Sequence, residues 1–219
     1  MTQSENRHFI YFADPMCSWC YGFGPVIREL ASRFKGRLSV RVIMGGLKAG
    51  ETRQMREKDI AYLRDAWKKV HEASGQPFTD AFFTRKTFTY DTEPSCRAVV
   101  TMRRLAPDKV LTYLAAVSKA FYADNRDITD ETVLAEIAEE TGLDRASFLS
   151  EIQSDLARQE TAGDFAFSKN SGVAGFPLLA AGNETTGYAL ITHGFRPIDG
   201  LPEAIEEWLA KGAPVTPVQ

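Results

Sequence analysis

The sequence predicts an α/β protein in which a long helical block interrupts a small β-sheet. Two strand patterns lie near the start of the chain and two near its end, whereas residues 52–170 show helical periodicity almost throughout. With 219 residues, 44% of them hydrophobic, the chain can fill a substantial core. The two outer parts need each other to bury one sheet. We therefore expect one discontinuous α/β domain, residues 1–50 and 171–219, and a helical insertion domain, residues 51–170.

The N-terminal part is predicted to form a strand, a helix and a second strand. Residues 8–13, HFIYFA, are aromatic and branched, and an Asp-Pro dipeptide ends this strand. From Cys17 onwards apolar residues recur every three or four positions until a Lys-Gly pair closes the helix. Residues 38–44, LSVRVIM, are typical of a second strand. This order places Cys17 at a helix N-terminus, shortly after a strand.

The inserted block is predicted to be all helical. Its first helix, over residues 52–74, has an apolar stripe and a glycine at its end. The next begins near Pro94, with Asp91 or Thr92 as its cap, and stops before Pro107. The remaining segments cover residues 110–121, 130–142 and 146–169, the last with breaks expected near Ser154 and Gly163.

Strand patterns return after the helical block. They cover residues 177–181, PLLAA, and residues 187–192, GYALIT. The GNETT segment between them suits a hairpin turn, so we expect the two strands to pair antiparallel. A final helix is predicted over residues 201–210.

Charge and composition argue against several functional classes. The chain has 26 Lys and Arg against 29 Asp and Glu, and a net charge of -3 gives no basic surface for nucleic acid. The apolar run at residues 8–13 is too short for a secretory signal or a membrane span. We therefore expect a cytoplasmic protein that binds neither nucleic acid nor membrane. The sequence leaves a monomer and a homodimer equally open.

Cys17 and Cys20 form a Cys-x-x-Cys pair within ADPMCSWCYG, in a chain whose only other cysteine is Cys96. Such a low cysteine density is not that of a disulfide-stapled secreted protein. Structural zinc usually needs four ligands, and beyond Cys96 the chain offers only three histidines, none in a second close pair. The sequence therefore predicts no metal site and favours a redox pair. Half a zinc site and an inert core pair stay open as alternatives.

The helix start gives Cys17 and Cys20 different chemistry. The first N–H groups of a helix lack internal partners and carry partial positive charge, which favours the nucleophilic thiolate at Cys17. Cys20, three residues on, is close enough for the Cα separation of roughly 5.5 Å of an unstrained disulfide. We expect Cys17 to attack a disulfide and Cys20 to resolve the mixed disulfide. Between them, Ser18 and Trp19 should tune the pair, with Trp19 exposed and in contact with substrate.

The segment GVAGFP, residues 172–177, precedes the third strand. A proline that opens a strand is a common turn arrangement, because it spares the sheet a missing N–H. The alternative is a cis Phe176-Pro177 bond, whose loop would present the backbone of Phe176 to an extended substrate by strand addition. The residues alone leave both interpretations open.

These motifs together resemble the DsbA-like branch of the thioredoxin superfamily, and within it the FrnE-like group of cytoplasmic dithiol-disulfide oxidoreductases. The resemblance spans nearly the whole chain. It implies a thioredoxin-like fold with a mixed four- to five-stranded sheet, split by a large all-helical insertion. The residues that carry it are DPMCSWCYG at 14–22, GVAGFP at 172–177, and YDTEPSCRA at 90–98.

The resemblance also implies a set of roles. Cys17 is the nucleophile, Cys20 is the resolving thiol, and Pro177 is cis and packed near the disulfide. No cofactor is bound, glutathione is a candidate thiol co-substrate, and the substrate is a protein or small molecule that carries a thiol or disulfide. Two departures limit what can be carried over: Ser-Trp stands where DsbA has Pro-His, and the second cysteine pair of some FrnE-like proteins is missing.

Two related branches supply the alternative function. Kappa-class glutathione transferases and 2-hydroxychromene-2-carboxylate isomerases share the fold but have serine at the position of Cys17. Because serine cannot form a mixed disulfide, the cysteine favours thiol-disulfide exchange. A glutathione-dependent transferase or isomerase is the rival hypothesis, and a binding module with vestigial cysteines is the third.

Asp14 and Cys96 each have two interpretations. Asp14 suits a helix cap or a turn, and the alternative is a proton acceptor for Cys20. Cys96 lies on an apolar helical face, where a free cysteine is most often a small core residue. Its alternative is an accessory role, in a regulatory disulfide with Cys17.

Overall fold

The computed structural model describes residues 7–211. Residues 1–6 and 212–219, which fall within the expected domain bounds, lie outside the described residues. The elements in chain order are β1 (His8–Ala13), α1 (Ser18–Arg33), β2 (Ser39–Met44), α2 (Glu57–Ser74), η1 (Asp80–Thr84), α3 (Glu93–Leu105), η2 (Pro107–Lys109), α4 (Val110–Tyr122), α5 (Glu131–Glu140), α6 (Arg145–Ile152), α7 (Asp155–Asn170), β3 (Leu178–Asn183), β4 (Gly187–His193) and α8 (Leu201–Lys211).

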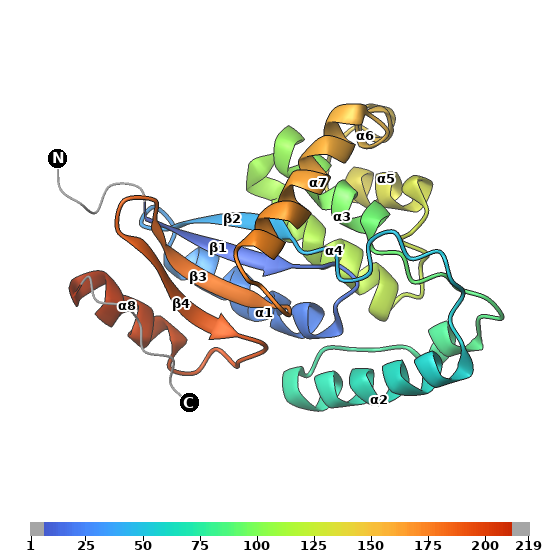
Figure 1. Ribbon diagram of the computed structural model, residues 1–219, viewed down its shortest axis with the longest axis horizontal. Helices are drawn as coiled ribbons and strands as arrows, with labels where there is room; N and C mark the ends of the chain where they lie inside the picture. The colour runs from blue at the N-terminus through green and yellow to red at the C-terminus, as the bar shows by residue number, and fades with distance from the viewer. Residues whose placement is uncertain (1–6, 212–219) are drawn as a thin grey trace.

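The strands form one mixed sheet in the order β2-β1-β3-β4 (Figure 1). β1 pairs parallel with β2 and antiparallel with β3, and β3 and β4 form the predicted antiparallel hairpin. Strands from the two ends of the chain thus complete a single sheet, which confirms the predicted α/β fold class and the lower of the two expected strand numbers.

β1 lies inside the sheet and is covered on both faces. Phe9, Tyr11 and Ala13 belong to the main core that includes α1, whereas Ile10 and Phe12 belong to a smaller cluster on the opposite face. On that opposite face Phe12 stacks on Phe167 of α7, with 5.9 Å between ring centroids. Burial on both faces explains why residues 8–13 read as an unbroken apolar run rather than an alternating one.

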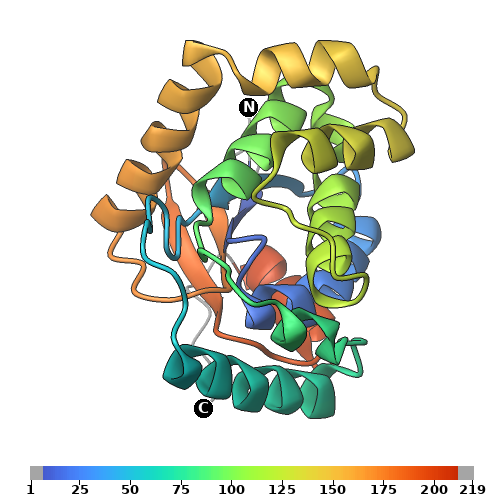
Figure 2. The ribbon, with the colours of Figure 1, turned by 90° about the vertical axis from the view of Figure 1, so that its right-hand side faces the viewer.

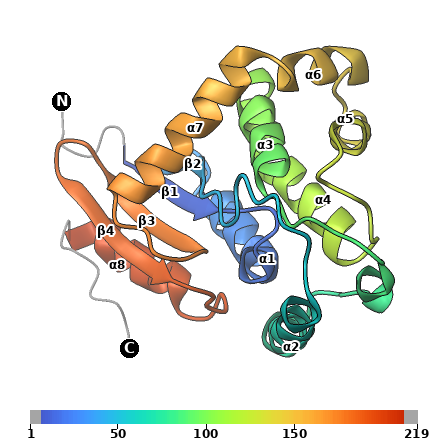
Figure 3. The same ribbon diagram turned by 45° about the vertical axis from the view of Figure 1, so that its right-hand side comes forward.

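The inserted helices lie in two places around the sheet. α3 and α7 pack against β2, while α2 lies apart from α5 and α6 and packs against α1 (Figures 2 and 3). The structure thus confirms a helical block between β2 and β3. That this block is a separate domain stays a prediction.

The helical block is hydrogen-bonded to the outer edge of β2 through Arg103 of α3 and Asp164 of α7. Arg103 donates to the carbonyl oxygen of Val42 at 2.5 Å and to the carboxylate of Asp164 at 2.7 Å. The same carboxylate accepts the backbone N–H of Met44 at 2.9 Å. The backbone carbonyl of Val42 and the N–H of Met44, at the C-terminal end of this edge strand, therefore have side-chain hydrogen-bond partners.

Two helix boundaries differ from prediction. α2 begins at Glu57 rather than near residue 52, because Gln54 bridges Thr89 and the preceding segment is held in extended form. The break expected at Ser154 is real, since its side chain caps α7, but α7 continues through Gly163 without a break. A single glycine costs only about 1 kcal/mol in a helix interior, and this 16-residue helix tolerates it.

Candidate active site

Cys17 is the N-cap of α1, where the sequence predicted it. Its backbone is extended (φ -90°, ψ 112°), and its side chain makes no capping hydrogen bond. A tight turn leads into the helix, because the Cys17 N–H donates to the Asp14 carbonyl oxygen at 3.0 Å. The thiol is directed across the fold instead, and Sγ donates to the carbonyl oxygen of Phe176 at 3.5 Å.

Cys20 lies one turn further along α1 and is a second free thiol. Cys17 is 7% exposed and Cys20 4%, so the pair is almost enclosed by the core. Burial raises the pKa of the Cys20 thiol well above its usual value, and the hydrogen bond with Cys17 raises it further. Cys20 is therefore a neutral thiol at physiological pH, which suits a proton donor to Cys17.

The Phe176-Pro177 peptide bond is cis, as the second interpretation of the GVAGFP loop predicted. Presentation of the Phe176 backbone to a substrate stays a prediction. Pro177 is buried, and its carbonyl oxygen accepts the N–H of Gly194 at 2.8 Å. The ring of Phe176 packs on Gly45, where a Cβ would lie 2.0 Å from the ring. The loop after the helical block thus meets the cysteines and the end of β2 at one point.

Ser18 and Trp19 lie between the two cysteines on the first turn of α1, and both are half-buried. Trp19 packs against Phe195, with 5.7 Å between ring centroids. Trp19 is thus half-buried rather than exposed as predicted, because the segment after β4 covers part of its ring. Contact of Trp19 with substrate stays a prediction.

Asp14 is a fully buried turn residue, as its first interpretation predicted. Its carboxylate accepts the N–H of Met16 at 2.8 Å and that of Leu47 at 2.7 Å. Burial raises the pKa of Asp14, and the hydrogen bonds from Leu47 and Met16 oppose that rise. Cys20 contacts the backbone of Asp14, whereas the hydrogen bonds of the carboxylate go to other groups.

Cys96 is fully buried in α3, in agreement with its interpretation as a core residue. Its thiol donates to the carboxylate of Asp14 at 3.4 Å, so it supports the turn beneath the pair. Burial, followed by the charge of Asp14, raises the pKa of the Cys96 thiol well above its usual value. A disulfide between Cys96 and Cys17 stays a prediction.

Two anchors of the turn before Cys17 were missed by sequence reasoning. The Tyr90 hydroxyl donates to the Met16 carbonyl oxygen at 2.5 Å, and the Ser118 hydroxyl donates to that of Pro15 at 3.0 Å. Tyr90 opens the motif at residues 90–98, but nothing local to that motif signals its partner. The helical block therefore shapes the turn that presents Cys17.

Replacement of Asp14 by alanine is expected to destabilise the protein by roughly 2–4 kcal/mol, because the buried N–H of Met16, the partly buried N–H of Leu47 and the buried Cys96 thiol lose their acceptor. Denaturant unfolding followed by circular dichroism measures the effect. Asp65→Ala is the matched control, since Asp65 is exposed on α2 and its loss should change stability by less than about 0.5 kcal/mol. Equal stabilities of the two variants would show that the Asp14 network contributes little.

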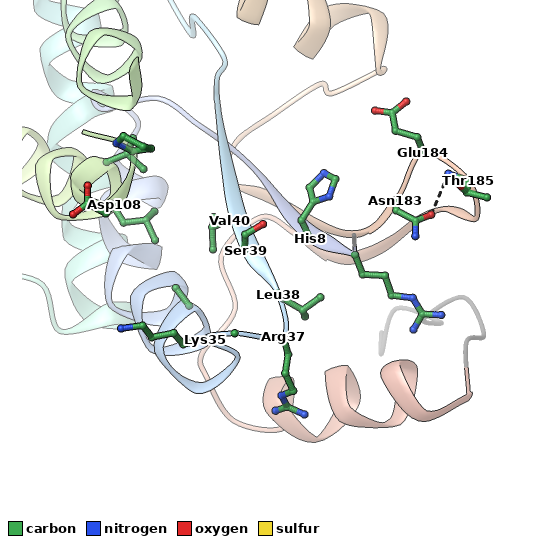
Figure 4. A pocket seen from close by; sticks show the side chains of 16 residues that line it. His8, Lys35, Arg37, Leu38, Ser39, Val40, Asp108, Asn183, Glu184 and Thr185 are labelled. Carbon is green, nitrogen blue, oxygen red and sulfur yellow. Dashed lines mark hydrogen bonds between the residues drawn. The ribbon is translucent and has the colours of Figure 1, made fainter. Parts of the chain in front are cut away.

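A sizeable cavity lies at the opposite end of the sheet from the cysteines (Figure 4). It has a volume of about 880 Å³ and is lined by His8, at the start of β1, and by Ser39 of β2. Charged residues of both signs surround it, among them Lys35 and Asp108. Neither cysteine of the pair lines it, so size alone does not identify the site.

Two structural findings concern the metal site and the membrane span that the sequence predicted to be absent. Within the described range no group of three or more His, Cys, Asp or Glu side chains could hold a metal ion. None of the helices in that same range is long and apolar enough to cross a membrane.

Solved structures that are similar to this chain include two disulfide-exchange proteins. A candidate protein disulfide isomerase from Nitrosomonas europaea is 35% identical, with a TM-score of 0.88 over 95% of this chain and 100% of that one. The cytosolic disulfide reductase DsbM from Pseudomonas aeruginosa is 24% identical, with a TM-score of 0.78 over 93% of this chain and 98% of that one. The latter likeness shows a shared fold.

Sequence comparison adds a curated relative and a family. The ClpXP adapter protein SpxH of Bacillus subtilis (strain 168) is 26% identical over 180 residues, 77% of this chain. The match spans only 56% of that relative's length. The family model described as thioredoxin matches residues 10–201. The chain therefore belongs to the thioredoxin family, as its resemblance to the DsbA-like branch implied.

Proposed function

We propose that this protein is a dithiol-disulfide oxidoreductase that exchanges thiols and disulfides through Cys17 and Cys20. One observation carries the proposal: two free thiols occupy the N-cap and first turn of α1, and the outer one contacts the carbonyl oxygen of Phe176. This geometry brings a nucleophile, a resolving thiol and a backbone acceptor to one point. The finer assignment to the FrnE-like group belongs to the same proposal.

The roles follow from the two environments. Cys17 has the unpaired N–H groups of a helix start beside it and attacks one sulfur of a substrate disulfide. The leaving thiolate departs, and Cys20 then attacks Cys17 in the mixed disulfide and releases the second substrate thiol. Phe176 and Pro177 form the wall along which an extended substrate would lie, and Ser18 and Trp19 tune the pair.

The Cys20→Ala variant is expected to accumulate mixed disulfides with its substrates through Cys17, because no thiol remains to resolve them. Non-reducing electrophoresis and mass spectrometry of the purified variant measure the trapped species. The Cys17→Ala variant is the control and should trap none. Equal trapping by the two variants would contradict the division of roles.

Cellular setting and co-substrate are part of the proposal. We place the protein in the cytoplasm, where a reducing environment would keep the pair mainly as a dithiol and favour reductase or isomerase work. Support comes from the similar DsbM of Pseudomonas aeruginosa, which is described as a cytosolic disulfide reductase and was also solved with GSH. Glutathione is thus the candidate thiol co-substrate. A glutathione transferase or isomerase is the alternative, favoured if glutathione binds tightly without disulfide reduction.

The similarity to SpxH supports a second candidate, binding of a partner protein as a protease adapter. A variant in which both Cys17 and Cys20 are serine separates the two functions. An adapter would still accelerate degradation of its bound partner by ClpXP, whereas an oxidoreductase would lose its effect on disulfides. Because this chain covers about half of that relative, the adapter role ranks second.

A further inference from the structure

A second cavity reaches the resolving cysteine from the side of α1 that faces α4. It has a volume of about 320 Å³ and lies between α1, α4 and residues 76–77; we call it the α1–α4 cavity. Tyr11 of β1 and Cys20 both line it. Exposed residues Arg28 and Thr112 also line it, so the cavity opens to solvent. It is large enough to hold several waters, whose share of volume is about 30 Å³ each.

Tyr11 and Cys20 lie together at the inner end of this cavity. The Tyr11 side chain is 1% exposed and packs against Phe23, and it belongs to the same buried core cluster as Cys20. A buried hydroxyl of this kind requires a hydrogen-bond partner, and the Cys20 thiol lines the same cavity. Both side chains therefore border the same space, which opens to solvent at Arg28 and Thr112.

The resolving thiol needs an exit for its proton. Cys20 is a buried neutral thiol, yet only the thiolate attacks a disulfide. In the mixed disulfide its neighbour Cys17 is bonded to substrate and can no longer take the proton. The hydrogen bonds of the Asp14 carboxylate go to Met16, Leu47 and Cys96 and not to Cys20, so they provide no path for the Cys20 proton.

We propose that Tyr11 is the proton relay of the resolving step and that it passes the Cys20 proton to water in the α1–α4 cavity. The inference rests on the proposed function and adds a residue to it. The Cys20 S–H proton moves to the Tyr11 oxygen while the Tyr11 hydroxyl proton moves to a cavity water. The Cys20 sulfur forms a bond to the Cys17 sulfur, the bond from Cys17 to substrate breaks, and the substrate leaves as a thiolate.

Other titratable groups near the relay come from three elements. Tyr21 and Arg28 face the cavity from α1, Lys119 faces it from α4, and Cys17 and Asp14 lie on the side of the active site. Lys119 is held by Asp124 at 2.7 Å and Arg28 is exposed, so neither is placed to take a proton from the inner end of the cavity. Tyr11 is the titratable group for which contact with Cys20 and lining of the cavity coincide.

A chromogenic aromatic disulfide separates the two chemical steps. Attack by Cys17 releases one coloured thiolate in a first phase, and resolution by Cys20 releases a second, both visible by stopped-flow absorbance. Tyr11→Phe removes only the hydroxyl and is expected to slow the second phase at neutral pH by about tenfold or more while sparing the first. The deficit should shrink in alkaline solution, where hydroxide removes the proton, and the solvent isotope effect on the second phase should change.

Two further variants make the test decisive. Tyr113→Phe is the matched control, because Tyr113 is equally buried but donates to Leu134 at 2.9 Å. Ala115→Leu keeps Tyr11 and fills part of the cavity, so it should also slow the second phase even if Tyr11→Phe folds poorly. A wild-type second phase and pH profile in either folded variant overturns the relay. Absence of the second phase in the wild type, or its persistence in Cys20→Ala, overturns the proposed function instead.

Discussion

Replacement of Cys17 by serine is expected to reduce disulfide exchange to the uncatalysed background. Serine has the same size but cannot form a mixed disulfide, and loss of a nucleophile can cost other enzymes up to about 10⁶-fold in rate. A loss of at least roughly 10³-fold should appear in the reduction of a fluorogenic peptide disulfide with glutathione as the electron source. Because Cys17 is at the N-cap and makes no side-chain cap, the substitution should leave stability nearly unchanged.

Cys96→Ser is the matched cysteine control for that experiment. Cys96 is fully buried in α3 and its thiol donates to Asp14, a bond that a serine hydroxyl can replace. Exchange activity should stay within about twofold of wild type, a difference of roughly 0.4 kcal/mol. A large loss of activity in Cys96→Ser with Cys17→Ser still active would reverse the assigned roles and favour the accessory role of Cys96.

Gly45→Ala is expected to lower both the stability of the protein and its rate of exchange, although it replaces no reacting group. The added Cβ would lie 2.0 Å from the ring of Phe176, so the ring and its loop must move. Overpacking of this kind costs roughly 1–3 kcal/mol of stability. Because the carbonyl oxygen of Phe176 accepts from the Cys17 thiol, the rate of exchange should fall as well.

Gly163→Ala is the control for the glycine substitution. Gly163 lies inside α7, and no atom lies within 4 Å of an added Cβ. Alanine should therefore stabilise the helix by roughly 0.5–1 kcal/mol and leave exchange unchanged. Denaturant midpoints and peptide reduction rates of both variants test the pair. A Gly45→Ala protein as stable and active as wild type would show that the Phe176 loop adapts freely.

Much of the candidate site could be predicted from the sequence because its signals are local. The N-cap position of Cys17 follows from a strand, a turn and an amphipathic helix in direct succession. A proline directly before the third strand suggested the cis bond at Phe176-Pro177. The turn role of Asp14 could likewise be predicted, because Asp14 directly follows a strand segment and precedes Pro15.

The rest of the site depends on residues far apart in the sequence. Tyr11 reads from the sequence only as one more aromatic residue of a strand, and its contact with Cys20 exists because α1 packs on that face of the sheet. The half-burial of Trp19 by Phe195 has the same origin, since the segment after β4 lies next to α1.

The sequence by itself predicted the order of the elements, the antiparallel hairpin, the helical block and the N-cap position of Cys17, and its resemblance to the DsbA-like branch implied the mixed sheet. Periodicity, turn residues and helix starts act over a few positions, so they can be read without the fold. The tertiary structure decided which groups surround that pair: Phe176 on Cys17, Tyr11 on Cys20, and Tyr90 and Ser118 on the turn before them. Burial and the pKa of a thiol depend on everything packed around it, and that is set only when distant segments meet.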